Sequence, residues 1–185
     1  ENSYKEQRNW RKYTKKYIAV DIVKDLITHH KDVFKDKNLE FRCLDIAEDV
    51  LPSADCALIR QVLQHLSNEE VQNIVSKLNA FKYVILTEHL PNEDFKPNKN
   101  IISGQGIRLK KKSGINVLLP PFNLKIVKEK QLLSITPENT KGRIVTTLYQ
   151  MYWIGTLYSN YFFNKNKNEC SSWHNNWFLL SDNIT

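Results

Sequence analysis

The segment YIAVDIVKDLITHHKDVF (17–34) opens the part of the chain whose pattern is most informative about architecture. It is followed by LEFRCLDIAEDVLPSADCALIRQVLQHLSNEEVQNIVSKL (39–78) and then by KYVILTEHL (82–90). Short apolar runs rich in β-branched and aromatic residues alternate here with segments of helical period. This alternation is typical of strand-helix-strand units and predicts an α/β fold with a mostly parallel sheet.

The second of the two helices expected in this region has a defined start. Ser67 is followed three residues later by Glu70, which is the sequence of a capping box. The first helix is expected to bury a stripe of apolar residues that begins at Val23. The expected strands are 17–20, 39–44, 56–59 and 83–87, and the expected helices are 23–34 and the segment that follows Ser67.

Polar residues stand where three of the expected strands end. Asp21 and Asp45 follow the first two strands, and Arg60 with Gln61 follows the third. Ligands of open parallel sheets bind at the carboxyl ends of the strands. We therefore expect these four residues to lie at a ligand site.

The remainder of the chain divides into a hairpin and two atypical ends. The segments 124–135 and 143–152 alternate between apolar and polar residues and are separated by turn-forming residues, which predicts an antiparallel hairpin at the edge of the sheet. Residues 1–16 are a basic lead-in to a single α/β domain of residues 1–154. Residues 155–185, rich in asparagine and aromatic side chains, show no clean period and are expected to form a separate tail.

Composition indicates a globular protein whose charge permits an anionic partner. Of the 185 residues, 41% are apolar and 25% are charged, with 27 Lys and Arg against 20 Asp and Glu. The basic excess is concentrated in 5–16 and 108–112. No interleaving of basic and aromatic residues supports a nucleic-acid site, so a basic nucleic-acid-binding domain remains only an alternative.

The three cysteines argue against a zinc site and for a reducing compartment. Cys43, Cys56 and Cys170 show no CxxC or CxxH spacing. The visible N-terminal segment has no signal-peptide pattern, and no apolar run is long enough to cross a bilayer. The expectation is a cytoplasmic protein without a membrane partner.

Several of these segments resemble a known family. YIAVDIVKDLI, FRCLDIAEDVLPSADCALIRQVLQHLSNEEV and KYVILTEHLP resemble consecutive blocks of class I S-adenosylmethionine-dependent methyltransferases, closest to small bacterial members. The later stretches SGQGIR and LLPPFN resemble the same subgroup, so the resemblance covers about residues 9–151. It implies a Rossmann-like fold, S-adenosylmethionine as cofactor, and methyl transfer to an oxygen or nitrogen of a small-molecule acceptor.

The resemblance also implies which residues contact the adenosine part of the cofactor. Asp21 takes the position of the acidic residue that accepts hydrogen bonds from the ribose hydroxyls, and Ile22 packs on the adenine. Asp45 accepts from the adenine amino group, and Ile46 offers its backbone N–H to the ring. Carboxylates suit these roles because they only accept hydrogen bonds, whereas hydroxyl and amino groups donate them.

The remaining candidates lie toward the reacting end of the cofactor. By the same resemblance, Arg60 and Gln61 stand beside the methionine and methyl part. His65 is the nearest candidate general base, with an ordinary packed histidine as the alternative. Arg108 is expected to pair with a carboxylate or phosphate of the acceptor.

One feature of the family pattern is missing from this sequence. The family begins with a strand that ends in an acidic, glycine-rich turn, whereas this chain has no glycine before Gly104, and Ala19 stands where the subgroup usually has glycine. The resemblance thus implies a domain truncated at its N-terminus, without its first strand, unless 1–16 and 155–185 rebuild that space. A non-catalytic remnant or binding module of the same fold is the main alternative, and a nucleotide-linked dehydrogenase would need the same absent turn.

Overall fold

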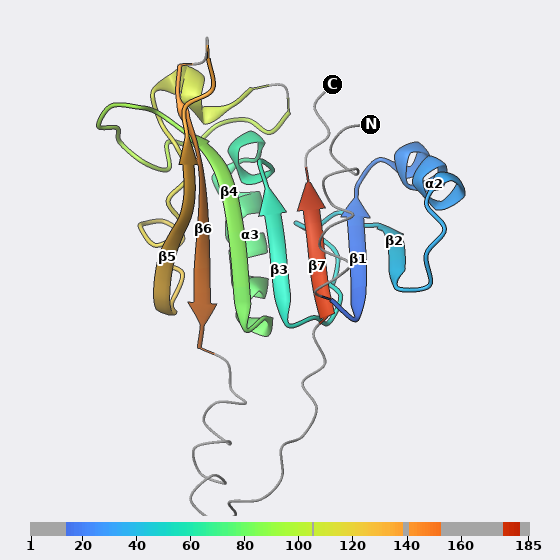
Figure 1. The fold of residues 1–185 in the computed structure, drawn as a ribbon. Coiled ribbons are helices and arrows are strands. Elements are labelled where there is room, and N and C mark those ends of the chain that lie inside the picture. The colour runs from blue at the N-terminus through green and yellow to red at the C-terminus, as the bar shows by residue number, and fades with distance from the viewer. Residues whose placement is uncertain (1–13, 105, 139–140, 153–175, 182–185) are drawn as a thin grey trace, which may run out of the picture.

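The described part of the chain forms one seven-stranded sheet with helices packed on it (Figure 1). The computed structural model describes residues 14–104, 106–138, 141–152 and 176–181, the last range by its backbone alone. The strands are β1 (Lys16–Asp21), β2 (Leu39–Cys43), β3 (Cys56–Arg60), β4 (Tyr83–Leu90), β5 (Ile126–Ile135), β6 (Arg143–Met151) and β7 (Asn176–Ser181). The helices are α2 (Lys24–Val33) and α3 (Asn68–Lys77), with short 3-10 helices η2 (Leu63–His65), η3 (Leu78–Ala80) and η4 (Arg108–Lys111).

The sheet is parallel except at one edge. The strand order is β2-β1-β7-β3-β4-β6-β5, and the neighbours from β2 through β4 all pair in parallel. β6 pairs antiparallel with β4 and with β5, so β5 and β6 form a hairpin that closes this edge. Every strand and helix expected within 17–90 is present, although β4 continues through Leu90 and shortens the expected loop 88–100.

The N-terminal boundary of α3 follows from its sequence. The Ser67 side chain accepts a hydrogen bond from the Glu70 backbone N–H, and the Glu70 carboxylate accepts from the Ser67 backbone N–H at 2.9 Å. The capping-box prediction is therefore confirmed. These reciprocal bonds satisfy donors that the first helical turn would otherwise leave open.

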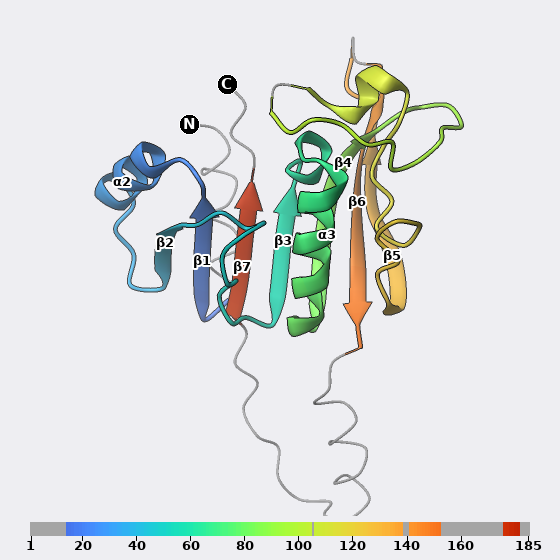
Figure 2. The same cartoon turned by 180° about the vertical axis from the view of Figure 1, so that it is seen from behind.

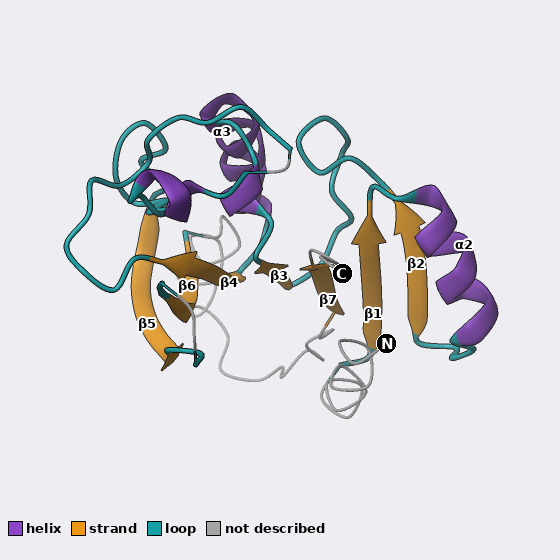
Figure 3. Cartoon of the chain, turned by 90° about the horizontal axis from the view of Figure 1, so that it is seen from above, coloured by secondary structure: helices purple, strands orange, loops and turns teal. Residues whose placement is uncertain are grey.

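The apolar runs of the strands are continuous because residues that point to either face of the sheet are buried. Alternate residues of β1 and β3 point to opposite faces: Ile18 and Ile59 join the core cluster that contains the apolar residues of α3, while Ala19 and Leu58 join a second cluster that contains Ile27 of α2. Figure 2 shows α3 lying along the sheet, and Figure 3 shows α2 beside β2 at the other edge. The parallel pairing of the central strands places their carboxyl ends at one edge of the sheet.

The main departure from expectation is the strand at the centre of the sheet. β7 lies between β1 and β3 and pairs in parallel with both (Figure 1). Residues 155–185 are expected from sequence to form a separate tail, whereas six of them form this central strand. The run NWFLLS is short and has no period that distinguishes a strand from other apolar segments, so only its partners reveal it.

β7 occupies the place in the sheet where the resemblance implied that the first strand is missing. It supplies the pairing that the facing edges of β1 and β3 require, because an unpaired edge within a sheet leaves backbone donors and acceptors open. The resemblance implied either a domain without its first strand or a domain in which other residues of the chain rebuild that space. The strand order agrees with rebuilding by the C-terminal residues.

The helices of the described ranges include none that combines the length and apolar character needed to cross a bilayer.

Candidate functional site

The candidate site lies along the edge at which the parallel strands end. Figure 3 views the sheet from this edge. The pairing register places Asp21 of β1, Ser181 of β7 and Arg60 of β3 at the same level, because Leu180 pairs with both Val20 and Ile59. Adjacent strands are about 4.8 Å apart, so Asp21 and Arg60 are separated by roughly 10 Å across the end of β7. A ligand that contacts both residues must pass over the end of β7.

Asp21 is partly buried and is oriented by its own turn. Its Oδ1 accepts a hydrogen bond from the Val23 N–H at 2.8 Å, and its backbone carbonyl accepts from the Leu44 N–H at 3.1 Å. The neighbouring Ile22 side chain is 64% exposed. An exposed isoleucine beside a fixed carboxylate offers an apolar surface and a hydrogen-bond acceptor in adjacent positions.

Asp45 begins a compact turn of residues 45–49. Its Oδ1 accepts from the Ala47 N–H at 2.9 Å, and its own N–H donates to Asp49 Oδ2 at 2.9 Å. Ile46 is buried, and its N–H donates to no acceptor within the part of the chain that the structure describes. The turn therefore presents a carboxylate and one spare backbone donor side by side.

The end of β3 is marked by a residue in an uncommon conformation. Gln61 has a φ of 56°, in the left-handed region that few non-glycine residues adopt. Its N–H donates to the Thr87 carbonyl at 2.7 Å, which holds the turn against β4. Arg60 remains exposed beside it. Conformations of this kind persist where the surrounding structure over-determines them, often at functional sites.

His65 lies in η2, directly beyond this turn, and its ring is engaged by Gln64. The Gln64 Oε1 accepts from the His89 N–H at 3.3 Å, so its Nε2 is the atom 3.1 Å from His65 Nε2. An amide NH₂ group only donates, and the imidazole nitrogen that faces it must therefore accept. In this arrangement the neutral His65 ring carries its proton on Nδ1.

Two buried polar residues at this edge escaped the sequence analysis. Glu88, 3% exposed, accepts from the Leu63 N–H at 3.2 Å, and Gln64 is 4% exposed. Together they fix η2 against the end of β4. The available signal was a charged residue inside the apolar run YVILTEHL, since a carboxylate in a core-facing strand position needs a specific partner.

The Arg108 guanidinium is engaged by groups of the protein itself. It is fully buried, and its guanidinium donates to the Leu63 carbonyl at 2.7 Å, to Asn68 Oδ1 at 2.8 Å and to the Lys99 carbonyl at 3.2 Å. Burial lowers the pKa of the Arg108 guanidinium, and the nearby carboxylates of Glu88 and Glu70 oppose that shift. These contacts give Arg108 a structural role, and its expected contact with an acceptor stays a prediction.

The segment between β4 and β5 is tied down over the start of α3. Ser103 Oγ donates to the Glu70 carboxylate, and the Gly104 N–H donates to the His65 carbonyl at 3.2 Å. Asn98, buried with a φ of 57°, holds the far side through its side-chain amide, which bonds Asn116 in both directions. Figures 1 and 2 show much of this segment gathered at the carboxyl end of β3 and β4. It therefore forms one wall of the candidate site.

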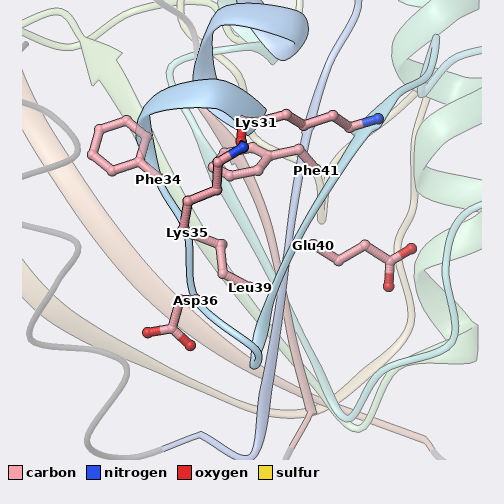
Figure 4. A pocket seen from close by; sticks show the side chains of 7 residues that line it. All are labelled: Lys31, Phe34, Lys35, Asp36, Leu39, Glu40 and Phe41. Carbon is pink, nitrogen blue, oxygen red and sulfur yellow. The ribbon is translucent and has the colours of Figure 1, made fainter.

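A pocket of about 470 Å³ lies elsewhere, between the end of α2 and the start of β2 (Figure 4). Phe34 and Phe41 contribute its aromatic surface, and Lys31 and Lys35 stand at its rim. The pocket is at the amino end of β2, whereas Asp45 follows the carboxyl end. It is not part of the candidate site.

Comparisons with known proteins support the fold. No protein-family model and no curated protein matches this sequence. Among solved structures, the N-terminal domain of EvdMO1 in the presence of SAH and D-fucose is similar, with a TM-score of 0.51 and 12% identity over 74% of this chain and 66% of that chain. This likeness shows that the chain shares the fold of that domain.

Two further solved structures were also found at TM-scores of 0.48. They are the N-methyltransferase NodS from Bradyrhizobium japonicum WM9 in complex with S-adenosyl-L-homocysteine, at 9% identity over 74% of this chain and 67% of that chain, and human N-acetylserotonin methyltransferase in complex with SAM, at 12% identity over 73% of this chain. This chain spans 40% of the length of the human protein.

Proposed function

We propose that this chain binds S-adenosylmethionine at the carboxyl edge of its sheet and transfers the methyl group to an oxygen or nitrogen of a small-molecule acceptor. One observation carries the proposal: Asp21 and Asp45 stand at the carboxyl ends of the adjacent parallel strands β1 and β2, in a chain with this fold. Two carboxylates in this arrangement suit a ligand that donates hydrogen bonds at two separated groups.

In this proposal the adenosine part of the cofactor lies along β1 and β2. Asp21 accepts from the ribose hydroxyls, and the exposed Ile22 side chain packs on the adenine face. Asp45 accepts from the adenine amino group, and the Ile46 N–H donates to the ring. A nucleoside would use both the exposed Ile22 side chain and the Ile46 N–H.

The reacting end of the cofactor then lies over β7, toward Arg60 and Gln61. S-adenosylmethionine supplies an activated methyl group on a sulfonium sulfur, so the protein contributes mainly by aligning the acceptor with that methyl group. His65 lies in η2 beside Gln64, whose Nε2 is 3.1 Å from the His65 Nε2. His65 stays the candidate general base expected from sequence.

A second candidate is a binding module of the same fold without transferase activity. The observation that favours it is the absence of a glycine-rich turn, since the chain has no glycine before Gly104 and Asp182 follows β7 in the sequence. A glycine permits close approach of the backbone to a ligand, which other residues hinder. A basic nucleic-acid-binding domain rests on net charge alone, and steep salt dependence of binding would mark it.

Calorimetric titration with S-adenosylmethionine and S-adenosylhomocysteine tests the proposal. We expect micromolar binding that is weakened at least about tenfold in Asp21→Ala and in Asp45→Asn, because each loses a charge-assisted hydrogen bond. Asp25→Ala is the matched control, since Asp25 is an exposed aspartate in the first turn of α2. Absence of binding by a folded protein would overturn the proposal.

Transfer is tested separately from binding. The protein is incubated with methyl-labelled S-adenosylmethionine and small-molecule fractions of a cell extract, and labelled products are sought by chromatography. Binding that depends on Asp21, without transfer to any fraction, would favour the binding module. Labelled product formation that is lost in Asp21→Ala would establish the transferase.

A further inference from the structure

The ammonium group of Lys77 holds the turn that carries Asp45. Lys77 is the last residue of α3, and its Nζ donates to the carbonyls of Ile46, Ala47 and Asp49 at 3.0, 2.8 and 2.8 Å. A lysine ammonium has three donors, and all three are directed into this one turn. The turn and α3 lie on the same face of the sheet, where Ile46 and Ala47 join the core beneath the helix (Figure 2).

One peptide plane links Lys77 to the Asp45 carboxylate. The carbonyl of Ile46 accepts from Lys77, and the N–H of the same peptide, that of Ala47, donates to Asp45 Oδ1. Because a trans peptide is planar, its C=O and N–H point in opposite directions. Fixing the carbonyl on Lys77 therefore aims the N–H at Asp45 and sets where that carboxylate lies.

Two backbone hydrogen bonds within the turn orient its spare donor. The Asp45 carbonyl accepts from the N–H groups of Glu48 and Asp49, at 3.2 and 2.7 Å. That carbonyl shares a peptide plane with the Ile46 N–H, which therefore points away from the interior of the turn. Both ligand-facing groups of the turn, the Asp45 carboxylate and the Ile46 N–H, depend on a conformation that Lys77 stabilises.

We propose that Lys77 is a positioning residue that gives the site its selectivity for adenine by holding the 45–49 turn. The inference rests on the proposed function, and it adds a residue that contacts no part of the ligand. Lys77 acts on the adenine end, because the hydrogen bonds of its ammonium group to the described residues go to the turn that carries Asp45 and Ile46. Removing it should weaken discrimination between purine bases more than it weakens binding of the rest of the cofactor.

The test compares two ligands that differ only at the base. S-adenosylhomocysteine carries the 6-amino group, whereas S-inosylhomocysteine has a 6-oxo group and a hydrogen on N1, so it offers neither partner for Asp45 and Ile46. We expect the wild-type protein to prefer the adenine ligand by about tenfold or more in calorimetric titration. In Lys77→Met this preference should fall to the level measured for Asp45→Asn, and Lys77→Arg should recover part of it.

Lys35→Met is the matched control for loss of a lysine that bonds a backbone carbonyl. Its Nζ donates to the Lys31 carbonyl at 2.7 Å, at the end of α2 and away from the 45–49 turn. We expect its base preference to equal that of the wild type. Hydrogen exchange without ligand supplies a second measurement: the Ala47 amide should exchange faster in Lys77→Met and at the wild-type rate in Lys35→Met.

The possible failures are distinguishable. If Lys77→Met bound both ligands more weakly but kept the wild-type ratio, Lys77 would only stabilise the fold, and the inference would be overturned while the proposed function stood. A wild-type protein that bound both ligands equally would also overturn it. Should Lys77→Met not fold, Lys77→Gln decides, with an unchanged ratio and unchanged Ala47 exchange contradicting the inference. No binding of either ligand to the wild type would overturn the proposed function as well.

Discussion

Arg60, the last residue of β3, lies opposite Ser181, the last residue of β7, in the parallel register of the two strands. β7, which ends beside the candidate site, is therefore formed by residues near the end of the given sequence. β7 is also the strand that joins the pair β2-β1 to the group β3-β4-β6-β5 in the described sheet. The stability of the sheet should consequently depend on backbone pairing of β7.

A proline in β7 tests this dependence. Leu179 pairs with Ala19 on one side and Leu58 on the other, and Leu179→Pro removes a backbone donor from a central strand. We expect the free energy of unfolding to fall by about 2–4 kcal/mol, measured by urea denaturation.

The control for this substitution is Leu132→Pro in the edge strand β5. Leu132 falls at a register shift between Gln131 and Leu133, where one residue has no direct partner on β6. Proline is tolerated at bulges and on edge strands, so we expect a change within about 1 kcal/mol. Equal stabilities of Leu179→Pro and the wild type would contradict the central position of β7.

The buried guanidinium of Arg108 predicts a stability effect. Arg108→Met leaves Asn68 Oδ1 without this donor and removes one of the two donors to the Leu63 carbonyl, which keeps the Leu66 N–H. We expect a loss of about 2–4 kcal/mol in urea denaturation. Lys110→Met, on an exposed residue of the same η4, should stay within about 0.5 kcal/mol. A wild-type stability for Arg108→Met, with weakened acceptor binding, would instead support the substrate role expected from sequence.

Glu40 predicts how stability changes at acid pH. Hydrogen bonds from Arg42 and Lys16 lower the pKa of the Glu40 carboxyl from 4.5 to about 2. A carboxyl whose pKa is lower in the folded state stabilises the fold above its unfolded pKa, and this contribution is lost as the pH falls from about 4.5 through about 2. Because the Glu40 side chain is 35% exposed, we expect the contribution to stay below about 1 kcal/mol.

The measurement is urea denaturation of the wild type and Glu40→Gln at pH 6 and pH 3. The difference in the free energy of unfolding between the two proteins should shrink at pH 3. A difference that is equal at both pH values would show that the ion pairs with Lys16 and Arg42 contribute nothing to stability.

The two described cysteines should differ in reactivity. Cys43 is exposed at the end of β2, whereas burial, with a smaller contribution from Asp55, raises the pKa of the Cys56 thiol to about 12. Because the thiolate is the reactive form, iodoacetamide at pH 8 should modify Cys43 and spare Cys56, as read by peptide mass spectrometry. Cys43 pairs with Asp21, so bound S-adenosylhomocysteine should slow its modification under the proposed function. Equal labelling of both cysteines would show that β3 is not buried as described.

Much of the architecture follows from local pattern. The strands around Asp21, Asp45 and Arg60 are short apolar runs, and α3 begins at a capping box whose residues are three positions apart, so neighbours along the chain suffice to specify them. The placement of polar residues at strand ends follows from the same runs, because parallel strands end at a common edge.

The roles of Arg108, Lys77 and β7 depend on partners that are distant in sequence. Arg108 bonds the Leu63 carbonyl, Lys77 bonds the turn at Ile46, and neither contact has a sequence signal because backbone carbonyls are common to all residues. The run NWFLLS becomes a central strand only because β1 and β3 present two facing edges that it can pair with. Local sequence pattern thus predicts the α/β elements and the position of the acidic residues at the strand ends. Long-range backbone pairing determines which segment completes the sheet, and burial determines which charged side chains are structural.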